Sequence, residues 1–87
     1  MATVMIPGAL VQLFPGAERK VEVEASTVRE VLDQLDARWP GMRDRLSDSQ
    51  PKIRQHITIF VDAEKAKLET VVSAGSLVEI IPAMSGG

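Results

Sequence analysis

Apolar and polar residues alternate in four short stretches of this 87-residue chain, and each stretch predicts a β-strand. The stretches are residues 3–6, 20–25, 56–61 and 77–82. Positions of equal parity point to one face of a strand, and the inward-facing set is Val4, Ile6, Val21, Val23, Ala25, Ile57, Ile59, Val61, Val78 and Ile80. We expect the first two strands to form an antiparallel hairpin with a long loop.

A period close to 3.6 residues predicts one main helix over residues 27–39. Its apolar stripe consists of Val28, Val31, Leu32, Leu35 and Trp39. Thr27 and Glu30 form a capping box, in which two side chains satisfy free backbone N–H groups at the start of the helix. Pro40-Gly41 ends it. A further short helical turn is expected at residues 42–46, and Trp39 is expected in the core.

The order of elements predicts a single α+β domain. A mixed sheet of four to five strands packed on one main helix buries every apolar face. If the first strand pairs with the last, the connection wraps over the helix, which is the ubiquitin-like β-grasp arrangement. We assign residues 1–82 to this domain and residues 83–87 to a flexible tail. Residues 62–65 are predicted as a turn, and the pattern leaves the conformation of residues 9–14 and 66–72 open.

Composition excludes several classes of function. The net charge is −2 with acids and bases interspersed, which argues against a nucleic-acid partner. The absence of cysteine excludes disulfides, thiolate metal sites and a cysteine nucleophile. We expect no bound metal or cofactor, no catalytic residues and no membrane span, and in the absence of a secretory signal pattern we expect the cytoplasm. An enzyme in its own right is not expected, because the single histidine, His56, has no evident partner.

The ending Met84-Ser85-Gly86-Gly87 offers a narrow chemistry at its terminal carboxylate. A carboxylate is a poor electrophile until a second enzyme converts it to an acyl-adenylate. Glycines without Cβ atoms suit a chain that must thread a tight channel. A sulfur nucleophile that displaced the adenylate would leave a thiocarboxylate on Gly87. The simpler interpretation is that two terminal glycines arise by chance, or from a linker, in a plain binding module.

The sequence resembles the MoaD/ThiS family of ubiquitin-like sulfur carriers along essentially its whole length. The resemblance lies in the ending at residues 80–87, the preceding residues 74–78, the opening at residues 4–7, the helix start at 26–28 and residues 58–62. The Pro-Ala-x-x-Gly-Gly ending and the long loop at residues 47–55 are most similar to the cysteine-biosynthesis, CysO-like branch. Asp62-Ala63-Glu64 departs from the Asn-Gly that many members carry at this turn.

This resemblance implies a mechanism and a set of partners. An E1-like enzyme of the MoeB, ThiF or MoeZ type would adenylate Gly87 with ATP and magnesium, and a persulfide donor would supply sulfur. The acceptor would be a pyridoxal-phosphate cysteine synthase or, in the molybdopterin branch, the large synthase subunit, and a JAMM-type peptidase is a further partner. Met84, Ser85 and Gly86 would be recognised as the tail. A ubiquitin-like modifier attached through Gly87 to lysines is the alternative.

Strand parity also predicts a docking face. Met5, Phe60 and Ile81 are expected on the sheet face turned away from the helix, with Pro7 beside them. Apolar side chains exposed together indicate an interaction surface. The competing interpretation is that residues 9–14 fold over this face or that the apolar residues are scattered.

Overall fold

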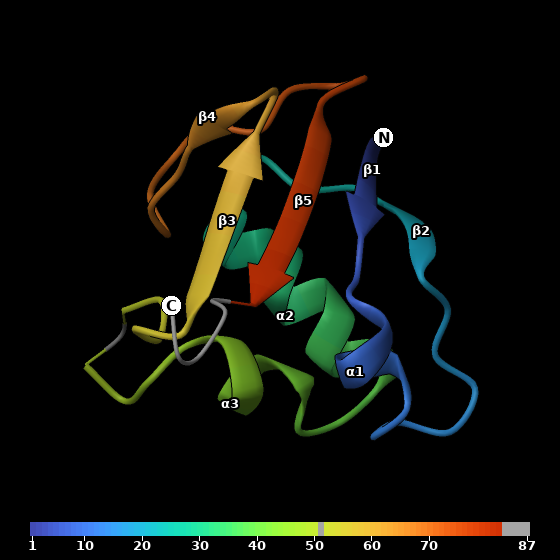
Figure 1. Ribbon diagram of the computed structural model, residues 1–87. Coiled ribbons are helices and arrows are strands. Elements are labelled where there is room, and N and C mark those ends of the chain that lie inside the picture. The colour runs from blue at the N-terminus through green and yellow to red at the C-terminus, as the bar shows by residue number, and fades with distance from the viewer. Residues whose placement is uncertain (51, 83–87) are drawn as a thin grey trace.

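The computed structural model describes residues 1–50 and 52–82 of the chain, and its centre is one five-stranded sheet. The strand order is β2-β1-β5-β3-β4, so the first strand of the chain lies beside the last. The strands are β1 (Ala2–Met5), β2 (Lys20–Val23), β3 (Ile57–Val61), β4 (Glu64–Lys65) and β5 (Leu77–Pro82). Figure 1 shows β5 in the middle of the sheet with helix α2 behind it.

The strand pairing confirms the predicted hairpin and explains how the chain crosses over. β1 pairs antiparallel with β2 and parallel with β5, while β3 pairs antiparallel with both β5 and β4. A parallel pair requires a crossover connection, and here the whole segment between β1 and β5, including the helices, supplies it. The sheet is therefore mixed, as predicted.

Alternation along the strands sends one face of the sheet into the core. Val4, Val23 and Val78 are fully buried, and Ile59 and Ile80 are nearly so. These side chains pack against the apolar stripe of α2 (Val28–Arg38), whose Val28, Val31, Leu32 and Leu35 are all buried. Trp39, predicted as a core residue, is half-buried and packs against the edge of the core. The predicted apolar faces of the strands and the helix are confirmed.

The start of α2 is capped by the two residues that the sequence indicated. The Thr27 hydroxyl accepts from the backbone N–H of Glu30 at 3.2 Å, and the Glu30 carboxylate accepts from the backbone N–H of Ser26 at 2.8 Å. The Arg29 and Val28 N–H groups donate to the carbonyls of Leu68 and Thr70. Three of these contacts satisfy N–H groups that a helix start otherwise leaves without partners, and the Glu30 carboxylate binds the N–H of the residue before the N-cap rather than that of Thr27.

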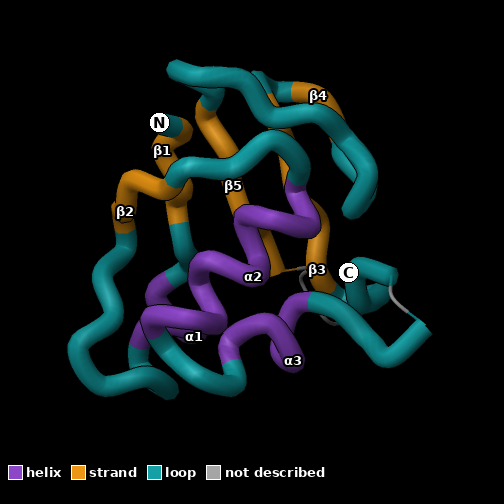
Figure 2. The backbone as a smooth tube through the Cα atoms, turned by 180° about the vertical axis from the view of Figure 1, so that it is seen from behind, coloured by secondary structure: helices purple, strands orange, loops and turns teal. Residues whose placement is uncertain are grey.

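Two short helices close the lower end of the core, as Figure 2 shows from behind the sheet. Helix α3 (Met42–Leu46) forms where a helical turn was predicted, and it buries Met42 and Leu46. It follows Gly41, whose φ of 99° lies in the left-handed region that favours glycine. Helix α1 (Gly8–Val11) covers the first half of residues 9–14, whose conformation the sequence left open, and its Leu10 is buried.

The segments around β4 differ from the sequence-based expectation. The predicted turn over residues 62–65 is shorter, because Asp62 and Ala63 alone make the turn and the next two residues pair with β3 as β4. Residues 66–72, left open between a strand and a helical turn, form a loop. Its carbonyls bind the first turn of α2, and Ala66, Leu68 and Val72 are buried. This tertiary contact, rather than a local pattern, fixes its shape.

The architecture is therefore the predicted α+β, ubiquitin-like β-grasp fold, with a sheet that covers one main helix. None of the helices in the described ranges is both long enough and apolar enough to cross a bilayer.

Candidate functional site

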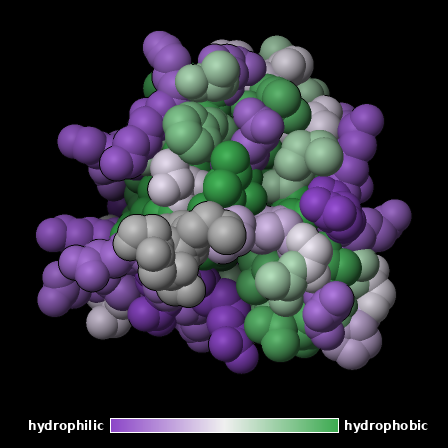
Figure 3. Space-filling model, viewed as in Figure 1, coloured by the Kyte–Doolittle hydropathy of each residue, from purple (hydrophilic) through white to green (hydrophobic). Residues whose placement is uncertain are grey.

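The face of the sheet turned away from α2 carries a group of exposed apolar side chains. Met5, Leu77 and Ile81 are 36%, 38% and 44% exposed, and Phe60 is half-buried among them. Figure 3 views this face and shows apolar side chains near its middle with hydrophilic ones toward its edges. We call Met5, Phe60, Leu77 and Ile81 the sheet patch. The structure thus brings together three of the residues selected from the sequence.

Leu77 is the member of the sheet patch that the sequence analysis missed. It pairs with Thr3 of β1 in the parallel register, and its neighbour Val78 is fully buried. The same parity that placed Ile81 outward applies to Leu77, since the two residues are four positions apart on one strand. The signal was present in the alternation of β5.

Pro7 lies outside the sheet patch, because it follows the last residue of β1 that pairs with β5. The pairing of β1 with β5 runs from Thr3 to Met5, and Pro7 then caps α1 in an extended conformation and is half-buried. The segment that follows does not cover the patch. Leu10 enters the core, and Phe14 packs against the core and approaches Gly41 beside α3. The alternative in which residues 9–14 fold over the patch is therefore wrong.

A row of charged and apolar residues crosses the patch through all five strands. Met5 lies opposite Lys20 on one side and Glu79 on the other. Glu79 in turn lies opposite Phe60, which lies opposite Lys65 of β4. Glu79 is half-buried, while both lysines are exposed. The patch therefore has a carboxylate at its centre and an ammonium group at each end of the row.

The N-terminal end of β5 is fixed by Asp62, which follows β3. Its carboxylate accepts from the Ser76 hydroxyl at 3.0 Å and from the Leu77 N–H at 2.9 Å. Its own N–H donates to the Leu77 carbonyl at 2.9 Å. These contacts hold β3 and β5, the two strands that contribute Phe60 and Ile81, in one register.

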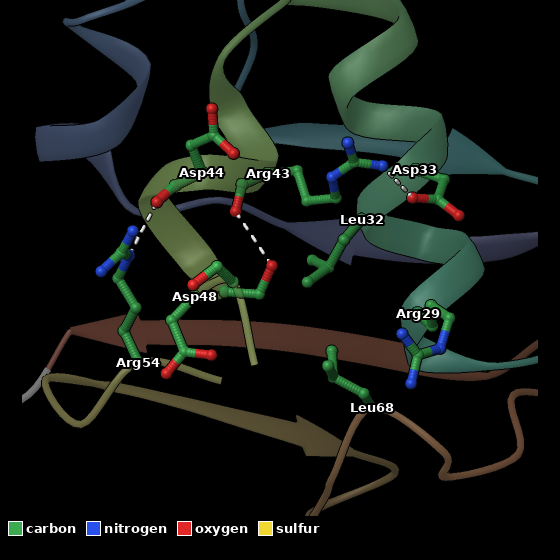
Figure 4. Close-up of a pocket in the computed structure, with 10 residues that line it drawn as sticks. Arg29, Leu32, Asp33, Arg43, Asp44, Asp48, Arg54 and Leu68 are labelled. Carbon is green, nitrogen blue, oxygen red and sulfur yellow. Dashed lines mark hydrogen bonds and ion pairs between the residues drawn. The ribbon is translucent and has the colours of Figure 1, made fainter. Parts of the chain in front are cut away.

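A second candidate site is a groove of about 560 Å³ between α2, α3 and the loop after β4. Figure 4 shows Leu32 and Leu68 within it and several charged side chains around them. Arg43 donates to Asp33 at 2.6 Å, a contact that raises the pKa of the Arg43 guanidinium. Arg54 donates to the backbone carbonyl of Asp44 at 2.7 Å.

Two further charged residues of this groove, Arg29 and Asp48, also make contacts within the chain. Arg29 pairs with Glu69 at 3.2 Å. Asp48 accepts from the N–H groups of Gln50 and Lys52 at 2.9 Å each, which lowers the pKa of its carboxyl group. The ion pairs of the groove are thus made within the chain.

Side chains that could bind a metal ion are not clustered within residues 1–50 and 52–82. No group of three or more His, Asp or Glu side chains there is placed to hold a metal ion. His56 is exposed just before β3. Asp36 accepts from the backbone N–H groups of Gly41 and Arg43, which anchors α3 to α2. The predicted tail residues Met84, Ser85, Gly86 and Gly87 lie outside the described residues.

Comparison with known proteins gives the same family that the sequence suggested. The ThiS family matches residues 4–87 of the chain. The sulfur carrier protein CysO of Mycobacterium tuberculosis is 31% identical over 91 residues, which cover 98% of this chain and 97% of CysO.

Solved structures agree in fold over the full length. CysO in the BexX/CysO complex of Amycolatopsis orientalis superposes with a TM-score of 0.88 at 32% identity, with all of both chains covered. SAMP1, a small archaeal modifier protein of Haloferax volcanii, superposes with a TM-score of 0.76 at 25% identity, with 99% of this chain and 98% of SAMP1 covered. The chain therefore belongs to the ThiS family and has its ubiquitin-like β-grasp fold.

Proposed function

We propose that this protein is a sulfur carrier that receives sulfur as a thiocarboxylate on Gly87 and donates it in a biosynthetic pathway. The observation that carries the proposal is that the family match runs through residue 87 and so includes the terminal Gly86-Gly87 pair. CysO relatives, which are named sulfur carrier proteins, support the cysteine branch ahead of the molybdopterin branch.

The chemistry of loading requires a second enzyme. The Gly87 carboxylate attacks the α-phosphate of ATP and releases pyrophosphate, with magnesium balancing the phosphate charge. A persulfide sulfur then attacks the acyl carbon and displaces AMP, and a thiol reduces the resulting acyl disulfide to the thiocarboxylate. The chain has no cysteine, so sulfur transferred to it can be retained at this carbonyl without competition from a side-chain thiol. The protein acts here as a co-substrate.

The sheet patch is the surface that we assign to docking of the activating enzyme. Met5, Phe60, Leu77 and Ile81 lie on β1, β3 and β5, and β5 is the strand that runs directly toward the tail. A partner seated on the patch would therefore have the tail within reach of its active site. Residues 83–87, if extended at about 3.3 Å per residue, span roughly 16 Å. Pro7 lies at the edge of this surface, and the tail residues Met84, Ser85 and Gly86 would be read by the channel that the tail enters.

Intact-mass spectrometry tests the proposal. The protein is incubated with ATP, magnesium and the E1-like enzyme of the same organism, first alone and then with a persulfide donor. We expect an AMP adduct and then, once a thiol is added to reduce the acyl disulfide, a mass increase equal to the exchange of one oxygen for sulfur. The variant that lacks Gly87 should show neither product while keeping its unfolding midpoint. Failure of the intact chain to form an adduct with an enzyme that adenylates its other substrates would refute the proposal.

The similarity to SAMP1 favours one second candidate, a modifier attached through Gly87 to lysines of other proteins. Both functions share the adenylate and diverge at the acceptor. Isopeptide-linked species of higher mass in the native host would indicate the modifier, whereas a thiocarboxylate without such species would indicate the carrier.

A further inference from the structure

Glu79 places a carboxylate in the middle of the sheet patch. It lies on the central strand β5, with Met5 opposite on β1 and Phe60 opposite on β3. Two ion pairs occur within residues 1–50 and 52–82, Arg29 with Glu69 and Arg43 with Asp33, so Glu79 forms none with these parts of the chain. Its apolar neighbours already remove it partly from water. A partner that covers Met5 and Phe60 must also cover Glu79.

Covering an unpaired carboxylate opposes association. Charged residues are depleted from the centres of protein interfaces, because a desolvated charge without a counter-charge destabilises the complex. Met5 and Phe60 favour burial of this area, whereas Glu79 opposes it unless the partner supplies a cation. A guanidinium suits the position because it is weakly hydrated and binds a carboxylate through two parallel hydrogen bonds.

The two lysines extend this charge pattern across the sheet. Lys20 and Lys65 lie two strands from Glu79 on either side, which corresponds to about 10 Å at the ordinary spacing of strands. The row therefore presents positive, negative and positive charge in order, with one apolar side chain between each pair. A complementary surface carries the opposite order.

We infer that the protein that docks on the sheet patch presents an arginine to Glu79 within an otherwise apolar surface, flanked by acidic side chains that face Lys20 and Lys65. This inference rests on the proposed function, since the E1-like activating enzyme is the occupant to which we assign the patch. Glu79 acts as a specificity-determining residue there: a partner that lacks the central cation is rejected.

A second copy of the chain fits the patch less well than such a partner. A twofold axis through the centre of the patch would bring Glu79 against its own counterpart, and like charges placed together oppose association. The same axis would align each lysine with a lysine of the other copy if the rows ran in register. The charge order therefore favours a different protein as the occupant.

Calorimetric titration of the E1-like enzyme of the same organism tests the inference. Glu79→Gln keeps the shape of the side chain and removes its charge, and we expect affinity to fall by about tenfold or more. Glu79→Arg should weaken binding further, and an Arg→Glu substitution at the opposing position of the enzyme should restore it. Glu64→Gln is the matched control, because Glu64 pairs with the buried Val61 and so lies on the other face of the hairpin. It should bind like the unmodified chain.

Adenylation of the unmodified chain at saturating enzyme separates the two possible failures. If the AMP adduct forms but Glu79→Gln binds as tightly as the unmodified chain, or more tightly, the inference is wrong and the proposed function stands. If no adduct forms, the proposed function is wrong, and the inference that depends on it is wrong as well. A concentration-dependent dimer that Glu79→Gln abolishes, seen by sedimentation, would also overturn the inference because the occupant would then be a second copy.

Discussion

The carboxylate of Asp62 accepts a hydrogen bond from the hydroxyl of Ser76 at 3.0 Å, across fourteen positions of the chain. Ser76 is almost completely buried, and its hydroxyl oxygen also accepts from the backbone N–H of Ser73. The other oxygen of Asp62 accepts from the N–H of Leu77, where β5 begins. One side chain therefore ties the end of β3 to the turn that starts β5, and it sets the register in which the patch residues lie.

Asp62→Ala should destabilise the fold by about 1–2 kcal/mol. The substitution removes two hydrogen bonds to a charged acceptor and leaves the buried Ser76 hydroxyl without its own acceptor. Asp62→Asn is the matched control, because asparagine tolerates the left-handed φ of 50° and keeps one acceptor for the Leu77 N–H. Urea unfolding measures both, and an alanine variant as stable as the asparagine variant would contradict the role of this carboxylate.

Ala63→Gly should stabilise the protein by a few tenths to about 1 kcal/mol. Asp62 and Ala63 both have positive φ, 50° and 72°, between directly paired strands, and such two-residue turns favour Asn-Gly or Asp-Gly. Glycine removes the cost of a Cβ atom in the left-handed region, which outweighs the greater entropy of glycine in the unfolded chain. Ala37→Gly, at the exposed next-to-last position of α2, is the control and should destabilise by up to about 1 kcal/mol. A lower urea midpoint for Ala63→Gly would refute this account.

The elements that the sequence predicted correctly are those whose pattern is local. The alternation of Val21 and Val23 in β2, and of Val78 and Ile80 in β5, determines which face is buried without knowledge of the partner strand. The Thr27–Glu30 cap likewise depends on residues three positions apart. Such signals place β-strands, the main helix and three of the four residues of the sheet patch.

The features that the sequence did not predict depend on contacts between distant residues. The loop over residues 66–72 takes its shape from hydrogen bonds to α2, so no local period describes it. The row through Glu79 requires the registers of four strand pairs, and Lys20 and Lys65 cannot be placed beside it until those registers are known. Strand β4 is two residues long and forms only because the turn at Asp62-Ala63 returns the chain onto β3.

Acid should weaken the loop that Asp48 organises. Hydrogen bonds from the backbone N–H groups of Gln50 and then Lys52, with the nearby Arg54 charge, hold the pKa of the Asp48 carboxyl below its usual value. A group whose pKa is lower in the folded state contributes stability that is present above its unfolded pKa and is lost as pH falls through the folded pKa. We expect the order of this loop to be constant at neutral pH and to decline in the acidic range below the ordinary aspartate pKa.

Amide resonances of Gln50 and Lys52 followed by NMR during an acid titration measure this effect. Both should shift with one midpoint, which lies below the midpoint of an aspartate in an unstructured peptide. Asp48→Asn keeps an oxygen acceptor but cannot titrate. In this variant the backbone amide resonances of Gln50 and Lys52 should therefore stay unchanged over the same pH range. A midpoint at or above the peptide value would contradict the contact between Asp48 and these two N–H groups.

Ile81→Asp should reduce binding of the E1-like activating enzyme while leaving the fold nearly as stable. Ile81 is 44% exposed on the face of β5 opposite the core, so it has roughly half of its burial still to gain, worth about 1 kcal/mol. The aspartate also adds a second carboxylate beside Glu79 that the partner must desolvate, and together these effects should weaken affinity by about tenfold or more. Val71→Asp is the control, because Val71 is 69% exposed but pairs with Thr27 at the start of α2, away from the sheet patch. Equal losses of affinity in the two variants would mean that general surface charge, rather than the sheet patch, governs binding. A large fall in the urea midpoint for Ile81→Asp would mean that the Ile81 side chain stabilises the fold, contrary to this prediction.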